Sequence, residues 1–122
     1  MANKQILIVD DEPIVRESIK DWLEDAGYKV DTAESGEEAE KMIGKKDFGV
    51  VIMDIRLPGK TGINVLKDIK SLKPQIKTII ITAYPTDEFA MEAKKYGAVD
   101  FIVKPINPDD LEKLITETLA KM

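Results

Sequence analysis

The sequence predicts an α/β fold: a doubly wound (βα)₅ three-layer sandwich around a parallel sheet with strand order 2-1-3-4-5. Five short apolar segments alternate along the chain with amphipathic segments of helical length. Three of the apolar segments, at 6–9, 50–53 and 79–81, are continuous rather than alternating. Continuous apolar strands are covered on both faces, which is typical of parallel sheets. Right-handed crossovers with short connections then favour the doubly wound order.

The predicted elements have sequence signals at their ends. Strands are expected at 5–9, 29–33, 50–53, 78–81 and 99–103. The first helix is expected at 13–26 and ends before Gly27, a residue suited to a helix C-terminus. Ser35 with Glu38 three residues later predicts the start of the second helix. The third is expected at 62–72, before Pro74. The inward face of the first helix is expected to carry Val15, Ile19, Trp22, Leu23 and Ala26.

The last two helices also have start signals. Thr86, followed by two acidic residues, is expected to open the fourth helix, because acidic side chains are favourable at the positive end of a helix. Asn107 and Pro108 are expected at the cap and first position of the fifth. No linker, repeat or low-complexity segment interrupts this pattern, so residues 1–122 are expected to form a single domain.

Composition excludes several classes of function. The chain has 122 residues, a net charge of −5 and no basic stripe, so nucleic-acid binding is not expected. No apolar run is long enough to span a membrane and no signal peptide is recognisable, so a cytoplasmic location is expected. The absence of cysteine and histidine excludes disulfides, thiol catalysis and imidazole chemistry. Chemistry must rest on carboxylates, hydroxyls and lysines.

Polar residues follow four of the predicted strands at their carboxyl ends, where open α/β sheets bind ligands. Asp10 and Asp11 follow the first strand and Asp54 the third, whereas Thr82 follows the fourth and Lys104 the fifth. Each alone has an ordinary reading: an aspartate or threonine often caps a helix or starts a turn, and a lysine is often a solvated surface charge. Their joint placement at one edge of the sheet predicts a functional site.

Electrostatics indicates what this cluster binds. At an effective dielectric of about 20, two carboxylates 4 Å apart repel each other by about 4 kcal/mol, which one lysine does not offset. Oxygen ligands without histidine or cysteine favour Mg²⁺, with Mn²⁺ as an alternative. Asp54, on the central strand, is the expected nucleophile toward phosphorus, and Asp11, supported by Asp10, is the expected metal ligand. Lys104 and Thr82 are expected to bind phosphoryl oxygens.

Four segments in order, ILIVDDEP, VIMDIRLPGKTG, TIIITAYP and DFIVKP, resemble the receiver domains of bacterial two-component response regulators. The resemblance spans the whole chain and implies the flavodoxin-like, CheY-like sheet. It is strongest to stand-alone sporulation phosphorelay receivers and to receivers of enhancer-binding regulators. It therefore implies either a single-domain relay protein or the front of a longer transcription regulator. The implied partner is a histidine kinase or histidine phosphotransferase, and the implied state is a monomer or a phosphorylation-dependent dimer.

The resemblance also implies a role for each matching residue. Asp54 is the implied phosphoacceptor. Asp11, Asp54 and the backbone carbonyl of Arg56 are the implied Mg²⁺ ligands, with Asp10 completing the acidic pocket. Thr82 is implied to turn toward the phosphoryl group and Lys104 to pair with it, in a chain that is a phosphoacceptor signalling domain rather than an enzyme. Such a domain assists its own phosphorylation and dephosphorylation, and the Lys104–Pro105 bond is implied to be cis.

The family's switch aromatic corresponds to Phe101, implied to move inward as Thr82 turns, so that the face formed by helix 4, strand 5 and helix 5 changes. A phenylalanine here replaces the commoner tyrosine, and plain core packing of this residue is the alternative. Lys60 and Thr61 also depart from the family pattern, although Thr61 is still suited to cap the third helix.

Residues around the site are expected to control access to it. Arg56 and Tyr84, each two residues beyond a site residue, are expected to line the path of water and to slow dephosphorylation. Partner docking is expected near the first helix, with Ile14, Pro85 and Ile106 as contacts. Three alternatives remain. A haloacid-dehalogenase-type phosphatase needs an acid where Arg56 stands. An FMN carrier needs a phosphate-binding loop after strand 1, where the acids of this chain would repel the phosphate. A static interaction module leaves the complete site unexplained.

Overall fold

The computed structural model describes residues 4–84 and 86–121, in which five strands alternate with five helices. The strands are β1 (Gln5–Val9), β2 (Lys29–Ala33), β3 (Val50–Asp54), β4 (Lys77–Thr82) and β5 (Asp100–Val103). The helices are α1 (Pro13–Asp25), α2 (Gly36–Lys45), α3 (Gly62–Leu72), α4 (Glu88–Lys95) and α5 (Pro108–Ala120). All strand pairs are parallel and the order is β2-β1-β3-β4-β5. The predicted fold class is therefore confirmed.

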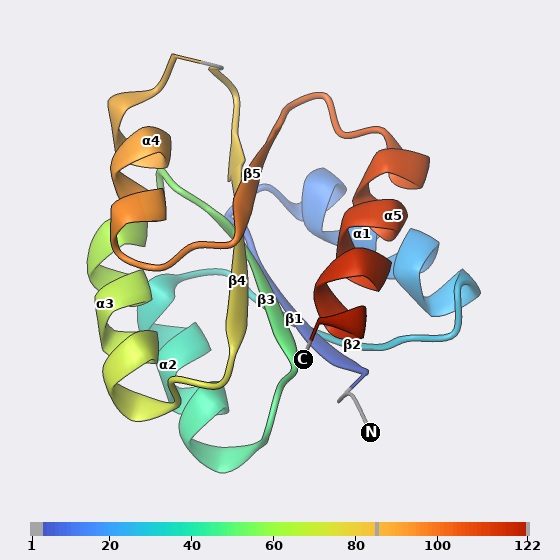
Figure 1. Cartoon of the computed structure of the whole chain (residues 1–122), viewed down its shortest axis with the longest axis horizontal. Helices are drawn as coiled ribbons and strands as arrows, with labels where there is room; N and C mark the ends of the chain where they lie inside the picture. The colour runs from blue at the N-terminus through green and yellow to red at the C-terminus, as the bar shows by residue number, and fades with distance from the viewer. Residues whose placement is uncertain (1–3, 85, 122) are drawn as a thin grey trace.

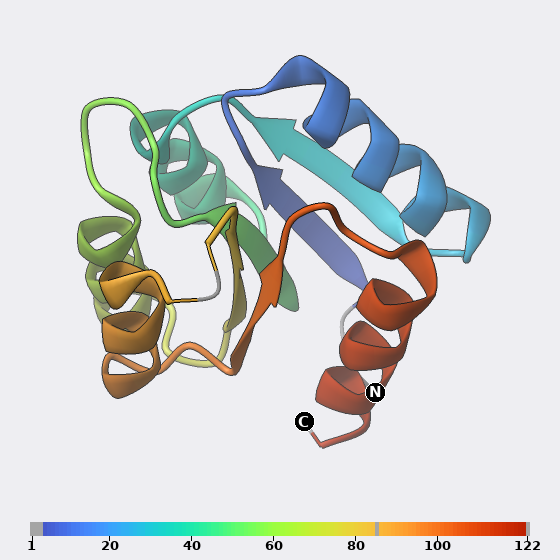
Figure 2. The same cartoon turned by 90° about the horizontal axis from the view of Figure 1, so that it is seen from above.

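Helices cover both faces of the sheet. Figure 1 shows α2, α3 and α4 on one side and α1 with α5 on the other. The view from above in Figure 2 shows the same three layers. Each side has its own apolar core, one built largely on Leu66, Ile69 and Ile80 and the other on Ile19, Ile52 and Ile115. The continuous apolar strands follow from this arrangement, because their residues enter the two cores alternately.

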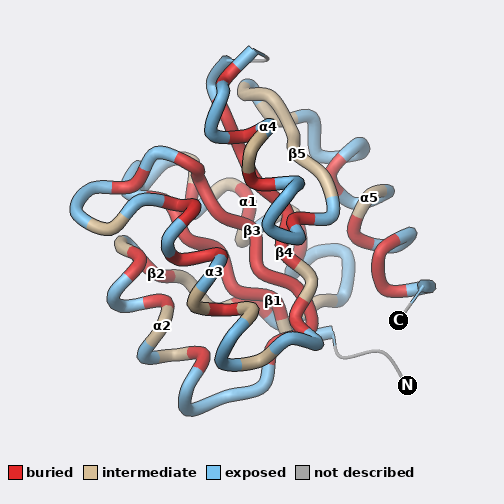
Figure 3. Tube along the Cα trace, turned by 60° about the vertical axis from the view of Figure 1, so that its left-hand side comes forward, coloured by how far each residue is buried: buried red, intermediate tan, exposed pale blue. Residues whose placement is uncertain are grey.

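Burial is greatest along the central strand. All five residues of β3 are buried, whereas all four residues of β5, at the edge of the sheet, are only half-buried. Figure 3 shows the buried central strands enclosed by helices that are buried only on their inward faces. The carboxylate of Asp54, at the end of β3, is consequently held by the most completely buried strand of the sheet.

The sheet register brings the ends of the strands together. Val9 pairs with Met53, Asp54 with Ile81, and Thr82 with Val103. The residues just beyond these pairs lie at the same edge of the sheet, because parallel strands all end on one side. This register places the predicted site residues of four different strands next to one another.

The start of α4 differs from the prediction. The helix is capped by Asp87, whose carboxylate accepts a hydrogen bond from the Phe89 backbone N–H, and not by Thr86. Aspartate and threonine are both good cap residues, so the local sequence did not discriminate between them. β5 also begins one residue later than expected, although the Val99 N–H still donates to the Thr78 carbonyl oxygen at 2.8 Å.

The other helix ends follow the sequence signals. Ser35 Oγ accepts from the Glu38 N–H, and Asn107 Oδ1 accepts from two backbone N–H groups of α5. Gly27, which follows the C-cap residue of α1, has a φ of 96°, a backbone angle that glycine tolerates best. The inward face of α1 is partly different from the expectation, because Ala26 is exposed and Arg16 is buried.

A close backbone approach fixes the loop between β3 and α3. The Gly62 N–H donates to the Ile55 carbonyl oxygen at 3.1 Å, and a Cβ at Gly62 would lie 2.6 Å from that oxygen. Only glycine fits here without moving the backbone, so the loop is held against the end of β3.

Within the described residues, no helix is long and apolar enough to cross a membrane.

Candidate functional site

Four carboxylates gather at the carboxyl end of the sheet. Asp10, Asp11, Glu12 and Asp54 each offer an oxygen, and these oxygens lie within 4.8 Å of one another. Asp10 and Asp54 are buried, whereas Asp11 and Glu12 are exposed. Glu12 was not among the site residues predicted from the sequence. Its position directly after the predicted pair of aspartates was the available signal.

Lys104 is the cation of this cluster. Its Nζ lies 2.8 Å from Asp54 Oδ2, 2.8 Å from Glu12 Oε1 and 3.3 Å from Asp10 Oδ2. Partial burial opposes the charged ammonium, but the hydrogen bonds to Asp54 and Glu12 outweigh it and raise the pKa of Lys104 above its usual range. The lysine therefore stays charged and holds three carboxylates together. The Lys104–Pro105 bond is cis, as the resemblance implied.

Asp10 is the most enclosed of the four acids. It is fully buried, and burial raises the pKa of its carboxyl group, although the hydrogen bond from the Glu12 N–H and the charge of Lys104 act in the opposite direction. Arg16 Nη1 donates to the Asp10 backbone carbonyl at 2.7 Å and so fastens α1 to the end of β1. This contact accounts for the unexpected burial of Arg16.

Both oxygens of Asp54 have partners. Oδ1 accepts from the Arg56 N–H at 2.9 Å, and Oδ2 accepts from Lys104. The carboxylate opens into a hollow of about 320 Å³ between the ends of β1, β3, β4 and β5. Its lining residues are Asp11, Glu12, Asp54, Ile55, Arg56, Thr82, Ala83, Tyr84 and Lys104. A group of phosphoryl size fits in this space next to Asp54.

The donor set fits a hard divalent cation. Asp10 Oδ2 is buried and, among the described residues, has no hydrogen-bond partner of good geometry although Lys104 lies near. One ammonium also leaves most of the charge on four carboxylates uncompensated. Oxygen-only ligands of this kind suit Mg²⁺ or Mn²⁺. The predicted ligands Asp11, Asp54 and Asp10 thus lie together.

Thr82, the predicted phosphoryl ligand of β4, lies in the same hollow but faces other partners. Its Oγ1 accepts from the Tyr84 N–H at 3.1 Å. Its proton lies within reach of the Tyr84 carbonyl oxygen at 3.1 Å and of Asp87 Oδ2 at 3.4 Å. The hydroxyl is therefore engaged within the loop after β4.

Asp87 is a second residue that the sequence analysis did not place at the site. Its carboxylate is buried, and Oδ2 accepts from Arg56 Nε at 2.9 Å. Burial alone would raise the pKa of Asp87, but the hydrogen bonds from the Phe89 N–H and from Arg56 hold that pKa below its usual value. Its only sequence signal was a position at a helix start, which many aspartates share.

The remaining predicted residues lie near the site. Arg56 and Tyr84 both line the hollow, Tyr84 with most of its surface exposed. The Arg56 guanidinium lies 4.9 Å from the centre of the Phe89 ring, on the side of Asp87. Phe101 is half-buried and packs against the core beneath α4. The roles expected for Arg56, Tyr84 and Phe101 remain predictions.

The unusual pair Lys60 and Thr61 fastens the loop after β3. Thr61 Oγ1 caps α3 by accepting from the Asn64 N–H at 3.3 Å, as expected. Lys60 Nζ forms ion pairs with Asp68 of α3 and, at 2.7 Å, with Glu40 of α2. This loop carries Arg56, so its attachment to two helices limits how far the site can deform.

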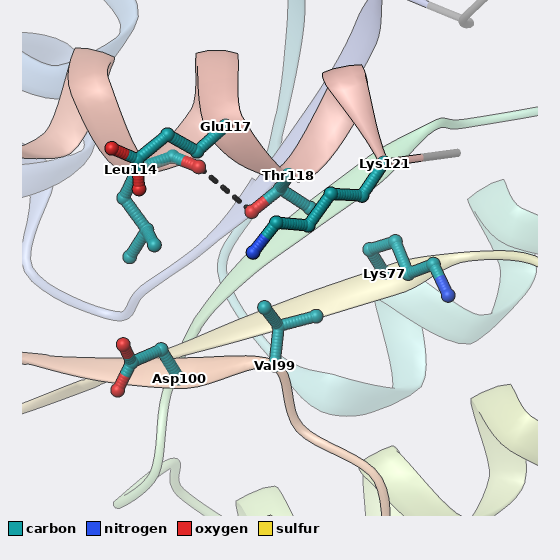
Figure 4. Close-up of a pocket in the computed structure, with 7 residues that line it drawn as sticks. All are labelled: Lys77, Val99, Asp100, Leu114, Glu117, Thr118 and Lys121. Carbon is teal, nitrogen blue, oxygen red and sulfur yellow. Dashed lines mark hydrogen bonds between the residues drawn. The ribbon is translucent and has the colours of Figure 1, made fainter.

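A second hollow, of about 270 Å³, lies at the opposite end of the sheet, where β4 and β5 begin (Figure 4). Lys77, Val99 and Asp100 line it from the sheet, whereas Leu114, Glu117, Thr118 and Lys121 line it from the side of α5. Thr118, on α5, donates its hydroxyl proton to the Leu114 carbonyl at 2.7 Å. This hollow shares no residue with the carboxylate site.

Comparison with known proteins agrees with this geometry. Residues 6–116 match the family model of the response regulator receiver domain. The chain belongs to this family. Receiver domains are signalling domains that act as phosphoacceptors. The phosphatase and FMN-carrier alternatives are thereby set aside.

Relatives and solved structures support the same assignment. The receiver is 38% identical over 122 residues to the transcriptional regulatory protein ZraR of Escherichia coli K12, covering 97% of this chain and 27% of that protein. A CheY-like response regulator receiver domain protein from Methanospirillum hungatei superposes with a TM-score of 0.93 at 36% identity, over 98% of this chain and 96% of that one. CheY4 of Vibrio cholerae gives 0.88 at 35%, over 98% and 99%. The chain spans about a quarter of the curated relatives it matches.

Proposed function

We propose that residues 1–122 form one receiver domain that accepts a phosphoryl group on Asp54, in a Mg²⁺-dependent reaction, from a phosphohistidine of a partner kinase or phosphotransferase. One observation carries this proposal. Asp54 ends the most buried strand with its carboxylate open to the hollow, 2.8 Å from Lys104 and within a cluster of carboxylates that suits a divalent cation.

The transfer is a displacement at phosphorus. An Asp54 oxygen forms the new O–P bond as the N–P bond to the donor imidazole breaks, and the imidazole nitrogen keeps the electron pair and takes up a proton. Lys104 and Thr82 would stabilise the charge that develops on the equatorial phosphoryl oxygens. Asp10, Asp11, Asp54 and the Arg56 carbonyl would hold Mg²⁺, which offsets the charge of the acids and of the phosphoryl group.

Phosphorylation would act as a switch. It replaces the single charge of the Asp54 carboxylate with a phosphoryl group that carries about −1.5 to −2 charges, and the hydroxyl of Thr82 is expected to turn toward this group. Phe101, half-buried under α4, is expected to move into the space that Thr82 leaves. The face formed by α4, β5 and α5 would then change its shape and its affinity for downstream partners.

The test is intact-mass spectrometry after incubation with acetyl phosphate, with Mg²⁺ or with a chelator. We expect a gain of one phosphoryl group that requires the metal and disappears after treatment with hydroxylamine, which cleaves acyl phosphates. No gain with acetyl phosphate or with a competent phosphohistidine donor would reject the proposal and favour the static interaction module.

Docking of the phosphodonor is expected beside the site. Ile14 is 82% exposed and, with Trp22 and Ile106, lines an apolar hollow of about 160 Å³ between α1 and the loop after β5. Pro85, the third expected contact, lies outside the described residues. Ile14→Lys is expected to slow transfer from the partner at least about tenfold, a loss of about 1.4 kcal/mol in the encounter, without changing phosphorylation by acetyl phosphate. Equal slowing with both donors would contradict docking here.

Self-dephosphorylation is expected to be slow, because Arg56 and Tyr84 are bulky and line the hollow through which water must approach Asp54. Replacing both residues, with Arg56→Asn and Tyr84→Ala, is expected to speed the decay of the acyl phosphate by about tenfold. This change in rate corresponds to lowering the activation free energy of hydrolysis by about 1.4 kcal/mol. The decay is followed by intact mass after removal of the donor. A decay rate unchanged from that of the unmodified chain would exclude this role.

A further inference from the structure

The carboxylate of Asp87 has more partners than a helix cap requires. Oδ1 accepts from the Phe89 N–H at 2.9 Å, which caps α4. Oδ2 accepts from Arg56 Nε at 2.9 Å and lies 3.4 Å from Thr82 Oγ1. The side chain is only 1% exposed, so these partners, and not water, stabilise its charge.

Capping alone explains neither the charge nor the burial. α2, α3 and α5 of the same chain are capped by the neutral side chains of Ser35, Thr61 and Asn107. A buried anion at the start of α4 is favourable only with the cationic and hydroxyl donors that face it. The ordinary reading of Asp87 as a cap therefore leaves its two additional contacts unexplained.

Both donors belong to the phosphorylation site. Arg56 follows Asp54 by two residues, and its own backbone N–H donates to Asp54 Oδ1. Thr82 ends the neighbouring strand β4. The two side chains line the hollow next to Asp54, yet their polar groups are directed to Asp87 and, for Thr82, also to the Tyr84 carbonyl. A phosphoryl group on Asp54 would offer them a second, more highly charged acceptor.

We propose that Asp87 is a positioning residue that competes with the phosphoryl group on Asp54 for the Thr82 hydroxyl and the Arg56 guanidinium. The inference rests on the proposed function of Asp54. In the resting protein, Asp87 withholds both donors from the site. When they turn to the phosphoryl group, Asp87 keeps only the backbone N–H donors of Phe89 and Ala90 in α4, and a buried carboxylate without a cationic partner is unstable. The first turn of α4 must then shift so that Asp87 reaches water.

This competition couples the site to α4 in both directions. Any change that weakens the hold of Asp87 on its donors must raise the affinity of the site for a phosphoryl group, because coupling between two sites is reciprocal. The coupling depends on two features of this sequence: an arginine two residues after Asp54, and an aspartate at position 87.

The test uses Asp87→Asn in the full chain. Asparagine keeps a cap oxygen, as Asn107 shows for α5, but removes the charge that holds Arg56. We expect beryllofluoride with Mg²⁺, a phosphoryl mimic, to bind about 5- to 10-fold more tightly, at the lower end of typical coupling effects. In Asp87→Asn without beryllofluoride, the backbone NMR signals of residues 88–95 should shift from their positions in the unmodified chain. The shift should be toward the positions that these signals take in the beryllofluoride complex of the unmodified chain.

A matched control and a double-mutant cycle separate competition from loosening of the helix. Asp109→Asn makes the same change of charge in the first turn of α5, away from both donors, and should leave beryllofluoride affinity unchanged. The gain from Asp87→Asn should shrink in an Arg56→Gln background, since the withheld donor is already absent. An equal gain in both backgrounds, or no gain, would overturn the proposal. Failure of the unmodified chain to bind beryllofluoride would instead overturn the proposed function.

Discussion

Asp54→Asn is expected to abolish the gain of a phosphoryl group from any donor, at any Mg²⁺ concentration. The amide nitrogen and oxygen of asparagine are far weaker nucleophiles than a carboxylate, and position 54 is the member of the carboxylate cluster that ends the central strand. The fold should be retained, because the amide oxygen of the substituted side chain can still accept the Arg56 N–H. Intact-mass spectrometry after acetyl phosphate treatment measures the loss, and circular dichroism checks the fold.

Asp11→Asn is the matched control for this prediction. It removes the same charge from the same cluster but from an exposed residue that would bind only the metal. Phosphorylation should weaken at low Mg²⁺ and recover as Mg²⁺ is raised, since the nucleophile is intact. Recovery of Asp54→Asn by added Mg²⁺, or phosphorylation of Asp54→Asn at another residue, would contradict the assignment of the phosphoacceptor.

Lys104→Met is expected to have the second-largest effect, on both reaction and stability. The ammonium bridges Asp54 and Glu12 and lies 3.3 Å from buried Asp10, and methionine has a similar length without the charge. Phosphorylation by acetyl phosphate should slow by roughly 10²- to 10³-fold, the effect of removing one charge-stabilising donor from a transition state. Initial rates from intact mass, at saturating Mg²⁺, provide the measurement.

The same variant should unfold at a lower temperature. Without the lysine, the acids repel one another, and the loss of one partner from a partly buried ion pair costs about 1–3 kcal/mol, below the full cost of a fully buried pair. Mg²⁺ should restore more stability to Lys104→Met than it adds to the unmodified chain, because the cation then compensates more charge. Lys113→Met, at an exposed position of α5, is the control and should unfold like the unmodified chain. A Mg²⁺ effect of equal size in Lys104→Met and the unmodified chain would mean that Lys104 does not compensate the acids.

The sequence was a good guide to elements with strong local signals. Continuous apolar runs identified β1 and β3, and cap residues such as Ser35 and Asn107 identified the starts of α2 and α5. It was wrong about the residue that caps α4, because Thr86 and Asp87 are both good caps and tertiary contacts decide between them. Arg56, 31 residues away in the sequence, and Thr82, at the end of β4, both approach the carboxylate of Asp87 and so select it as the cap.

Sequence by itself determined the order of strands and helices and the residue types at each strand end. Apolar periodicity and strand-end acids are local properties, and a parallel sheet places all strand ends on one edge. Only the tertiary structure decided which atoms meet there. It brought Glu12 to Lys104, buried Arg16 against Asp10, and turned Arg56 toward Asp87. These contacts join segments that no local pattern links, because distances between side chains follow from how helices and loops pack on the sheet.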